Sequence, residues 1–143
     1  MGRRSREELV QRLMAHQERA EQLTRELRAH TPQLIYPQDR QVLAEQAHRI
    51  AEHAKLLRES LYAVGGKPVE VEGLLLGGGR NWDRIALDLK LAEEYEYRLD
   101  VDVHWVTQRD PKLGELLGEL REEGRAVRKA LVQLLAKLDP YGR

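Results

Sequence analysis

Apolar residues recur in four stretches of this chain, at alternating steps of three and four positions. Side chains at that spacing lie on one face of an α-helix, so each stretch predicts a helix with one buried face. One helix cannot bury such a face alone, whereas four of them pack together as a bundle. The pattern therefore predicts an all-α four-helix bundle, with helices at about residues 5–30, 38–64, 82–107 and 111–138.

The predicted buried faces follow the heptad spacing of helical bundles. The first face consists of Leu9, Leu13, His16, Ala20, Leu23, Leu27 and His30. The second consists of Leu43, Ala47, Ile50, Ala54, Leu57, Leu61 and Val64. The third consists of Ile85, Leu89, Ala92, Glu96, Leu99, Val103 and Val106. The fourth consists of Leu113, Leu117, Leu120, Gly124, Val127, Leu131, Leu134 and Leu138.

Local signals indicate where the helices begin and end. Asp110 and Pro111 favour a helix start, as N-cap and first helical residue, and Asn81 is the expected N-cap of the third helix. Gly65-Gly66 closes the second helix, because glycine adopts the left-handed cap conformation at little cost. Residues 101–106 alternate as a strand would, but a lone strand would have no partner, so a helix is expected there.

The lengths of the connections predict the topology. Short links join the first helix to the second and the third to the fourth, so each pair forms an antiparallel hairpin. The link between the pairs, residues 66–80, is long enough to return along the whole bundle as a crossover. Leu74, Leu75 and Leu76 are expected to pack against the bundle on the way. One domain covering residues 1–143 follows.

Composition excludes several classes of protein. The formal net charge is zero, with 24 basic and 24 acidic residues, which argues against a nucleic-acid partner. No cysteine is present, so disulfides and thiolate sites are excluded. No secretory signal and no apolar run of about 18 residues occur, so no membrane association and a cytoplasmic location are expected. The excess of Arg over Lys fits a thermophile.

Polar residues interrupt the predicted buried faces near the middle of the bundle. His16 and Glu96 occupy face positions, and His53 flanks the second face. Residues equally far from a hairpin turn lie side by side on its two helices, so Glu122 of the fourth helix is expected at the level of Glu96 of the third. One interpretation is a buried hydrogen-bonded network in which His16 and Glu96 pair, since buried polar groups need partners. The other is a metal site, since bundles hold metals with carboxylates and imidazoles from several helices.

Three short stretches carry a family resemblance. His53-Ala54 lies in the second helix, and Gly65-Gly66 begins twelve residues after the histidine. Residues 120–125 of the fourth helix read Leu-Arg-Glu-Glu-Gly-Arg, and residues 88–91 precede Glu93 in the third. These stretches resemble bacterioferritins and rubrerythrin-type proteins of the ferritin-like superfamily, which carry E-x-x-H-A and E-E-G-H there. The resemblance implies a ferritin-like bundle with one long crossover and a di-iron site.

The resemblance transfers only part of the metal site. Five residues match the family's metal site or lie at the same level of the bundle. These candidate metal ligands are His53, Glu96, Glu122, His16 and Glu93. Ile50 stands where the family keeps a glutamate, and Arg125 stands where it keeps a histidine. A guanidinium is permanently cationic and would repel a metal, so Arg125 is expected to pair with Glu122 or Glu96.

The departures decide the predicted function. We expect a non-catalytic ferritin-like protein with a decayed metal site, no cofactor, and a homo-oligomeric assembly of two or more copies. The alternative is a divergent iron- or manganese-binding ferroxidase, oxidase or storage protein with an atypical centre. A third interpretation is a partner-binding helical module, with exposed aromatic residues such as Trp82, Trp105 and Tyr141 as anchors.

Overall fold

The computed structural model describes residues 1–75 and 79–141, and all regular secondary structure in those residues is helical. In chain order the elements are α1 (Arg3–His30), the 3-10 turn η1 (Thr31–Gln33), α2 (Pro37–Ala63), α3 (Asn81–Arg109) and α4 (Pro111–Lys137). Residues 101–106 are part of α3 and are helical throughout. The predicted all-α four-helix bundle is confirmed.

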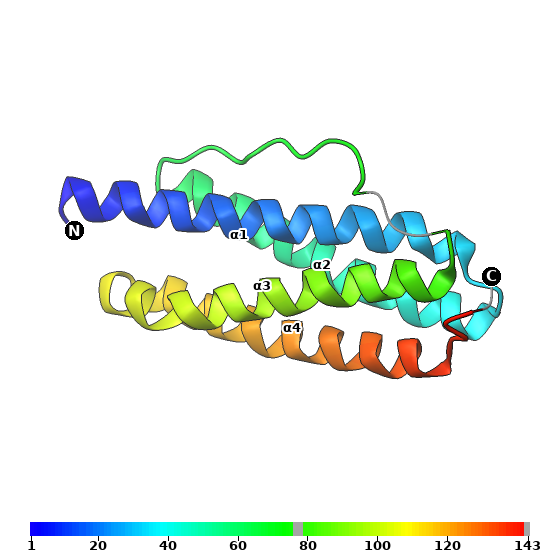
Figure 1. The fold of residues 1–143 in the computed structure, drawn as a ribbon. Coiled ribbons are helices and arrows are strands. Elements are labelled where there is room, and N and C mark those ends of the chain that lie inside the picture. Colours follow the sequence, from blue (N-terminus) through cyan, green and yellow to red (C-terminus); the bar gives the residue numbers. More distant parts are fainter. Residues whose placement is uncertain (76–78, 142–143) are drawn as a thin grey trace.

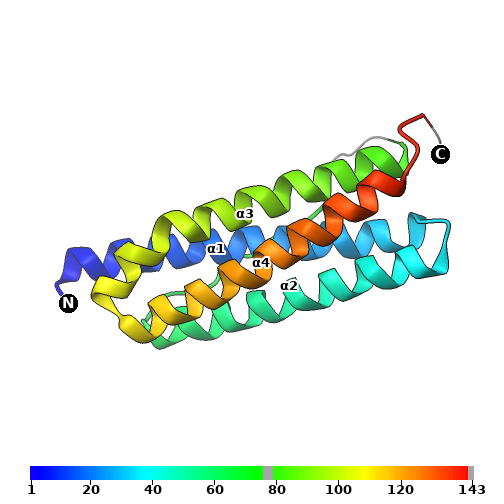
Figure 2. The ribbon, with the colours of Figure 1, turned by 90° about the horizontal axis from the view of Figure 1, so that it is seen from below.

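Two antiparallel hairpins build the bundle, α1 with α2 and α3 with α4 (Figures 1 and 2). After α2 the chain runs back along the length of the bundle, so α2 and α3 point in the same direction (Figure 1). Helix α1 packs against α2 and α3, and α4 packs against α3 and α2. The predicted topology, two hairpins joined by one long crossover, is therefore confirmed.

The helix ends carry the expected residues, with one difference in how they are used. Asp110 caps α4, because its side chain accepts a hydrogen bond from the backbone N–H of Leu113 at 3.1 Å, and Pro111 follows as the first helical residue. Gly65 adopts φ +85° directly after the C-cap of α2. Asn81, expected to cap α3, is instead its first helical residue and donates to the carbonyl of Gln33.

The core confirms three of the four predicted faces almost residue by residue, with Val64 and Leu138 only partly buried. The face of α3 differs, because its buried positions include Asp88, Tyr95 and Asp102. Each of these lies one residue before the predicted position, so Leu89, Glu96 and Val103 stand at the edge of the core. The prediction chose the neighbouring positions because it followed apolar residues, and two of the three buried residues, Asp88 and Asp102, are acidic.

The crossover is attached to α1 through its backbone rather than through its leucines. Gln17 donates to the carbonyl of Val69 at 2.8 Å and accepts from its N–H at 2.6 Å. Arg25 donates to the carbonyl of Gly73 at 3.0 Å, and Glu26 accepts from the N–H of Leu75.

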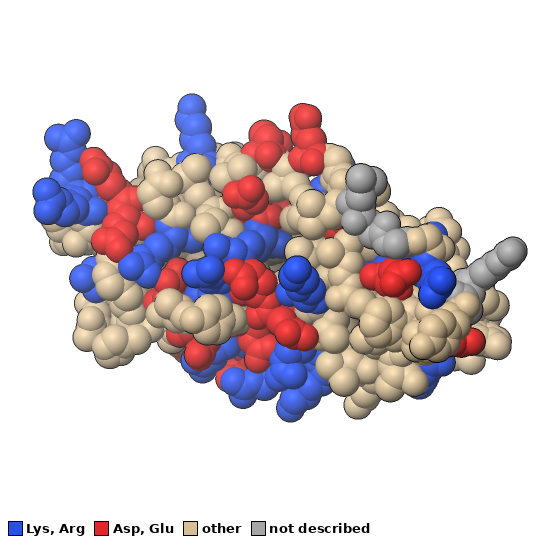
Figure 3. Space-filling model, in the orientation of Figure 1, with Lys and Arg blue, Asp and Glu red and all other residues tan. Residues whose placement is uncertain are grey.

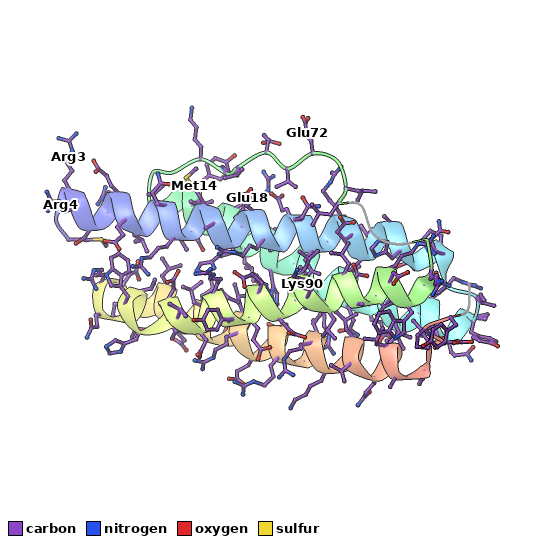
Figure 4. The ribbon with its side chains drawn as sticks, viewed as in Figure 1. Arg3, Arg4, Met14, Glu18, Glu72 and Lys90 are labelled. Atoms are coloured by element: carbon purple, nitrogen blue, oxygen red, sulfur yellow. The ribbon has the colours of Figure 1, made fainter. Side chains whose placement is uncertain are left out.

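The expectation that the three crossover leucines pack on the bundle was wrong for the two that are described. Leu74 and Leu75 are 54% and 46% exposed, and Leu76 lies outside the described residues. Figure 4 shows the side chain of Glu72 pointing away from the helices. The α1 side chains thus supply hydrogen-bond partners to four backbone groups of this extended segment, at residues 69, 73 and 75.

Two glycines of α4 should respond oppositely to substitution by alanine. A Cβ at Gly114 would lie 2.5 Å from Thr107 Cα, whereas a Cβ at Gly118 would meet nothing within 4 Å. We expect Gly114→Ala to lower the free energy of unfolding by about 1–3 kcal/mol through overpacking. Gly118→Ala should raise it by about 0.5–1 kcal/mol through helix propensity. Urea denaturation measures both, and equal effects would contradict the close approach of α3 and α4 at Gly114.

Candidate functional site

Two buried histidine–aspartate pairs join α1 to α3. His16 Nε2 lies 2.7 Å from Asp102 Oδ2, and His30 Nδ1 lies 2.8 Å from both carboxylate oxygens of Asp88. The two histidines are two heptads apart on α1, and the two aspartates are two heptads apart on α3 in the opposite direction. Both pairs therefore fit one antiparallel register of the two helices.

The pair at Asp102 extends into a network that reaches the surface. Arg12 Nη1 lies 2.5 Å from Asp102 Oδ1, and Arg12 Nη2 lies 2.7 Å from Glu8. The Arg12 guanidinium also stacks on Trp105, 4.3 Å from its ring centroid. Burial disfavours ionised Asp102, but the hydrogen bond from His16 and the charge of Arg12 prevail and lower its pKa. The expected partner of His16 was Glu96, and this expectation was wrong.

The pair at Asp88 is enclosed in the core. Asp88 has no exposed surface, and His30 is 8% exposed. His30 belongs to the predicted buried face of α1, and its burial agrees with that prediction. Burial raises the pKa of Asp88 to about 6, although the hydrogen bond from His30 opposes the shift. The two aspartates thus have pKa values displaced in opposite directions by different surroundings.

The third buried histidine, His53 on α2, pairs with Tyr95 on α3. His53 Nδ1 lies 2.9 Å from Tyr95 Oη. A phenol can donate or accept, and we assign Tyr95 as the donor because the Glu123 carboxylate lies near Nε2 and favours the tautomer with its proton there. His53 Nε2 then carries the proton and faces Glu123 of α4 at 3.6 Å without a hydrogen bond. Burial lowers the pKa of His53 and raises that of Tyr95. His53 therefore favours the neutral form.

Close packing holds the Tyr95 ring against α4. A Cβ at Gly124 would lie 3.8 Å from two ring carbons of Tyr95, so the glycine backbone faces the ring directly. Ile50, which stands where the sequence resemblance leads one to expect a glutamate, is fully buried in the same core. A phenol ring and an isoleucine thus take up interior space near His53.

The remaining candidate ligands pair with arginine or face outward. Glu96 lies 2.5 Å from Arg128 Nε and 3.3 Å from Arg125 Nε. Arg125 also lies 3.4 Å from Glu122, so the expected pairing of Arg125 with these carboxylates is confirmed. Glu93 and Glu122 are exposed. Figure 3 shows basic and acidic side chains interleaved in this way over one face of the molecule.

The geometry does not assemble the five candidate ligands into a di-iron centre. His16 pairs with Asp102, His53 pairs with Tyr95, and Glu96 is neutralised by two guanidinium groups. Among residues 1–75 and 79–141, no three histidine or acidic side chains are arranged so that they could hold a metal ion together. Whether any candidate ligand binds a metal in another arrangement stays a prediction.

Sequence reasoning did not single out the polar partners on α3. Asp88, Tyr95 and Asp102 follow one another at intervals of one heptad, as His16 and His30 stand two heptads apart on α1. That shared spacing of polar residues was the available signal. It was missed because the apolar residues one position further along α3 repeat with the same period.

Comparison with known proteins gives a match in structure. No protein-family model matches the sequence, and no curated protein matches it either. The solved structure of Dps from Thermosynechococcus elongatus superposes with a TM-score of 0.83 and covers 96% of each chain, at 18% sequence identity. This chain has the ferritin-like fold. The expected ferritin-like architecture is thereby confirmed, and identity at this level supports the fold alone.

Within residues 1–75 and 79–141, no helix is both long enough and apolar enough to span a membrane.

Tyr95→Phe should destabilise the ferritin-like bundle by about 1–3 kcal/mol, because it leaves the buried Nδ1 of His53 without a donor. Tyr97→Phe is the matched control: Tyr97 lies two residues further along α3 and is 58% exposed. It should change stability by less than about 0.5 kcal/mol. Denaturant titration at pH 7 compares the two, and an equal loss in both variants would contradict the His53–Tyr95 hydrogen bond.

Proposed function

We propose that this chain is a single-domain, non-catalytic ferritin-like protein in which buried polar pairs replace metal ligands as the connection between helices. The observation that carries the proposal is that every buried histidine has a side-chain partner on α3. His16 pairs with Asp102, His30 with Asp88, and His53 with Tyr95. These contacts connect α3 to α1 and α2, the helices of the other hairpin.

Such pairs contribute more to the choice of one helix register than to the stability of the bundle. Removing two polar groups from water costs free energy that their mutual attraction only roughly offsets. A wrong register, however, would leave a histidine or an aspartate buried without a partner, which costs about 1–3 kcal/mol for each group. We infer that the pairs select one arrangement of the four helices, the task that a metal bridging several helices would otherwise perform.

One observation favours the alternative of an iron- or manganese-binding protein. His53 Nε2 is buried and has no hydrogen-bond partner, and Glu123 Oε1 lies 3.6 Å away. Imidazole and carboxylate are ligands that both metals accept. His53 and Glu123, with Glu122 as a neighbour, would hold such an ion. The positive charge of Arg125, which pairs with Glu122, opposes this.

Metal analysis tests the two possibilities on the purified protein. We expect protein grown in medium supplemented with iron and manganese to contain less than stoichiometric metal, and iron(II) oxidation to match the buffer blank. Stoichiometric metal that is lost in His53→Ala and Glu123→Gln, but kept in His104→Ala, would overturn the proposal. His104 is the control because it is an exposed histidine on α3.

We also propose that the chain forms a homo-oligomer of two or more copies. Large apolar side chains on its surface support this, among them Ile35 and Tyr36 at the first hairpin turn and Tyr62 on α2, each more than half exposed. Apolar groups gain free energy when a partner removes them from water. Light scattering should give a mass at least twice the 16.6 kDa of one chain. A mass of one chain at every concentration would contradict assembly.

A further inference from the structure

A buried cluster of three titratable side chains lies where the crossover meets α1 and α3. Glu26 has no exposed surface, and its Oε1 accepts hydrogen bonds from the N–H of Leu75 and, at 3.4 Å, from Gln22. Its Oε2 has no hydrogen-bond partner and lies 3.8 Å from His30 Nε2. Asp88 contacts the opposite nitrogen of His30. One imidazole thus stands between two buried carboxylates.

The cluster has too little positive charge for its two carboxylates. Helix α1 contributes Glu26 and His30, and α3 contributes Asp88. The crossover, as far as residue 75, contributes the uncharged N–H of Leu75. Among the described residues, no Lys or Arg forms an ion pair within 4 Å with either carboxylate. Even with His30 protonated, the cluster carries a net negative charge in the core, which one proton would neutralise.

We propose that Glu26, His30 and Asp88 form an acid-tightened latch that holds the crossover on α1. Glu26 belongs to the latch because the same carboxylate that anchors Leu75 also faces His30. When the crossover lifts, Glu26 gains water and its charge no longer acts on Asp88 through the dry interior. The other two anchors, Gln17 with Val69 and Arg25 with Gly73, contain no group that titrates near neutral pH.

The direction of the effect follows from proton linkage. Burial raises the pKa of Asp88 to about 6, the hydrogen bond from His30 opposes the shift, and the charge of Glu26 adds to it. Opening the crossover hydrates Glu26 and weakens that contribution, so the pKa of Asp88 is higher in the closed state than in the open state. Protonation therefore favours closure. The added stability of the closed state is present in acid and is lost as the pH rises through about 6.

Hydrogen exchange of the full-length protein, followed by mass spectrometry, tests the latch. Protection of peptides covering residues 67–75, corrected for the intrinsic pH dependence of exchange, should rise by about threefold to tenfold between pH 7.5 and pH 5. A tenfold change corresponds to about one pKa unit between the open and closed states. Unchanged or falling protection in the unmodified protein would overturn the proposal.

Two substitutions and a control separate the latch from a general effect of acid. Glu26→Gln keeps an acceptor for the Leu75 N–H but removes the charge, and Asp88→Asn keeps an acceptor for His30 but does not titrate. Both should abolish the pH-dependent rise. Asp102→Asn alters the equivalent histidine–aspartate pair at His16, two heptads before His30 on α1, and should retain it. A rise that survives in a folded Glu26→Gln or Asp88→Asn variant would refute the latch.

Discussion

The constraint on which this structure depends is that a polar side chain buried between helices must find a partner in one register only. His16 and His30 on α1 meet Asp102 and Asp88 on α3, two heptads apart on both helices. A shift of one turn would leave four buried polar groups unpaired at once. Apolar faces tolerate such a shift far better, because one leucine packs much like the next. The charged pairs therefore define how the two hairpins fit together.

The same constraint accounts for the crossover. Among its described apolar side chains, Leu74 and Leu75 are exposed, and Pro68, Val69 and Val71 are only partly buried. Gln17, Arg25 and Glu26 of α1 bind its backbone at residues 69, 73 and 75. A segment held by a few polar contacts opens at a lower cost than a packed helix does. Conformational freedom in this fold is thus expected in the crossover first.

Much of the fold could be predicted from the sequence, because four apolar faces and proline- or glycine-marked ends are local signals. Less of the interior could be predicted. The face of α3 was displaced by one residue, since a pattern search treats Asp88 and Asp102 as surface residues unless their histidine partners are known. The pairing of Arg125 with Glu96 and Glu122 was predicted correctly, because charge alone required it. Partners that lie on different helices are non-local information, which spacing within one helix does not contain.

The interior near His53 shows how hydrogen-bonded and apolar side chains fill the centre of this ferritin-like bundle. Tyr95 donates to His53 and its ring lies against the backbone at Gly124, so one side chain both satisfies the histidine and fills space. Ile50 adds apolar volume in the same core, and Arg125 and Arg128 draw Glu96 toward the surface. Each of these side chains fills interior space or pairs a charged group. Together they leave the interior near His53 closely packed, with α2 and α3 joined by the His53–Tyr95 hydrogen bond.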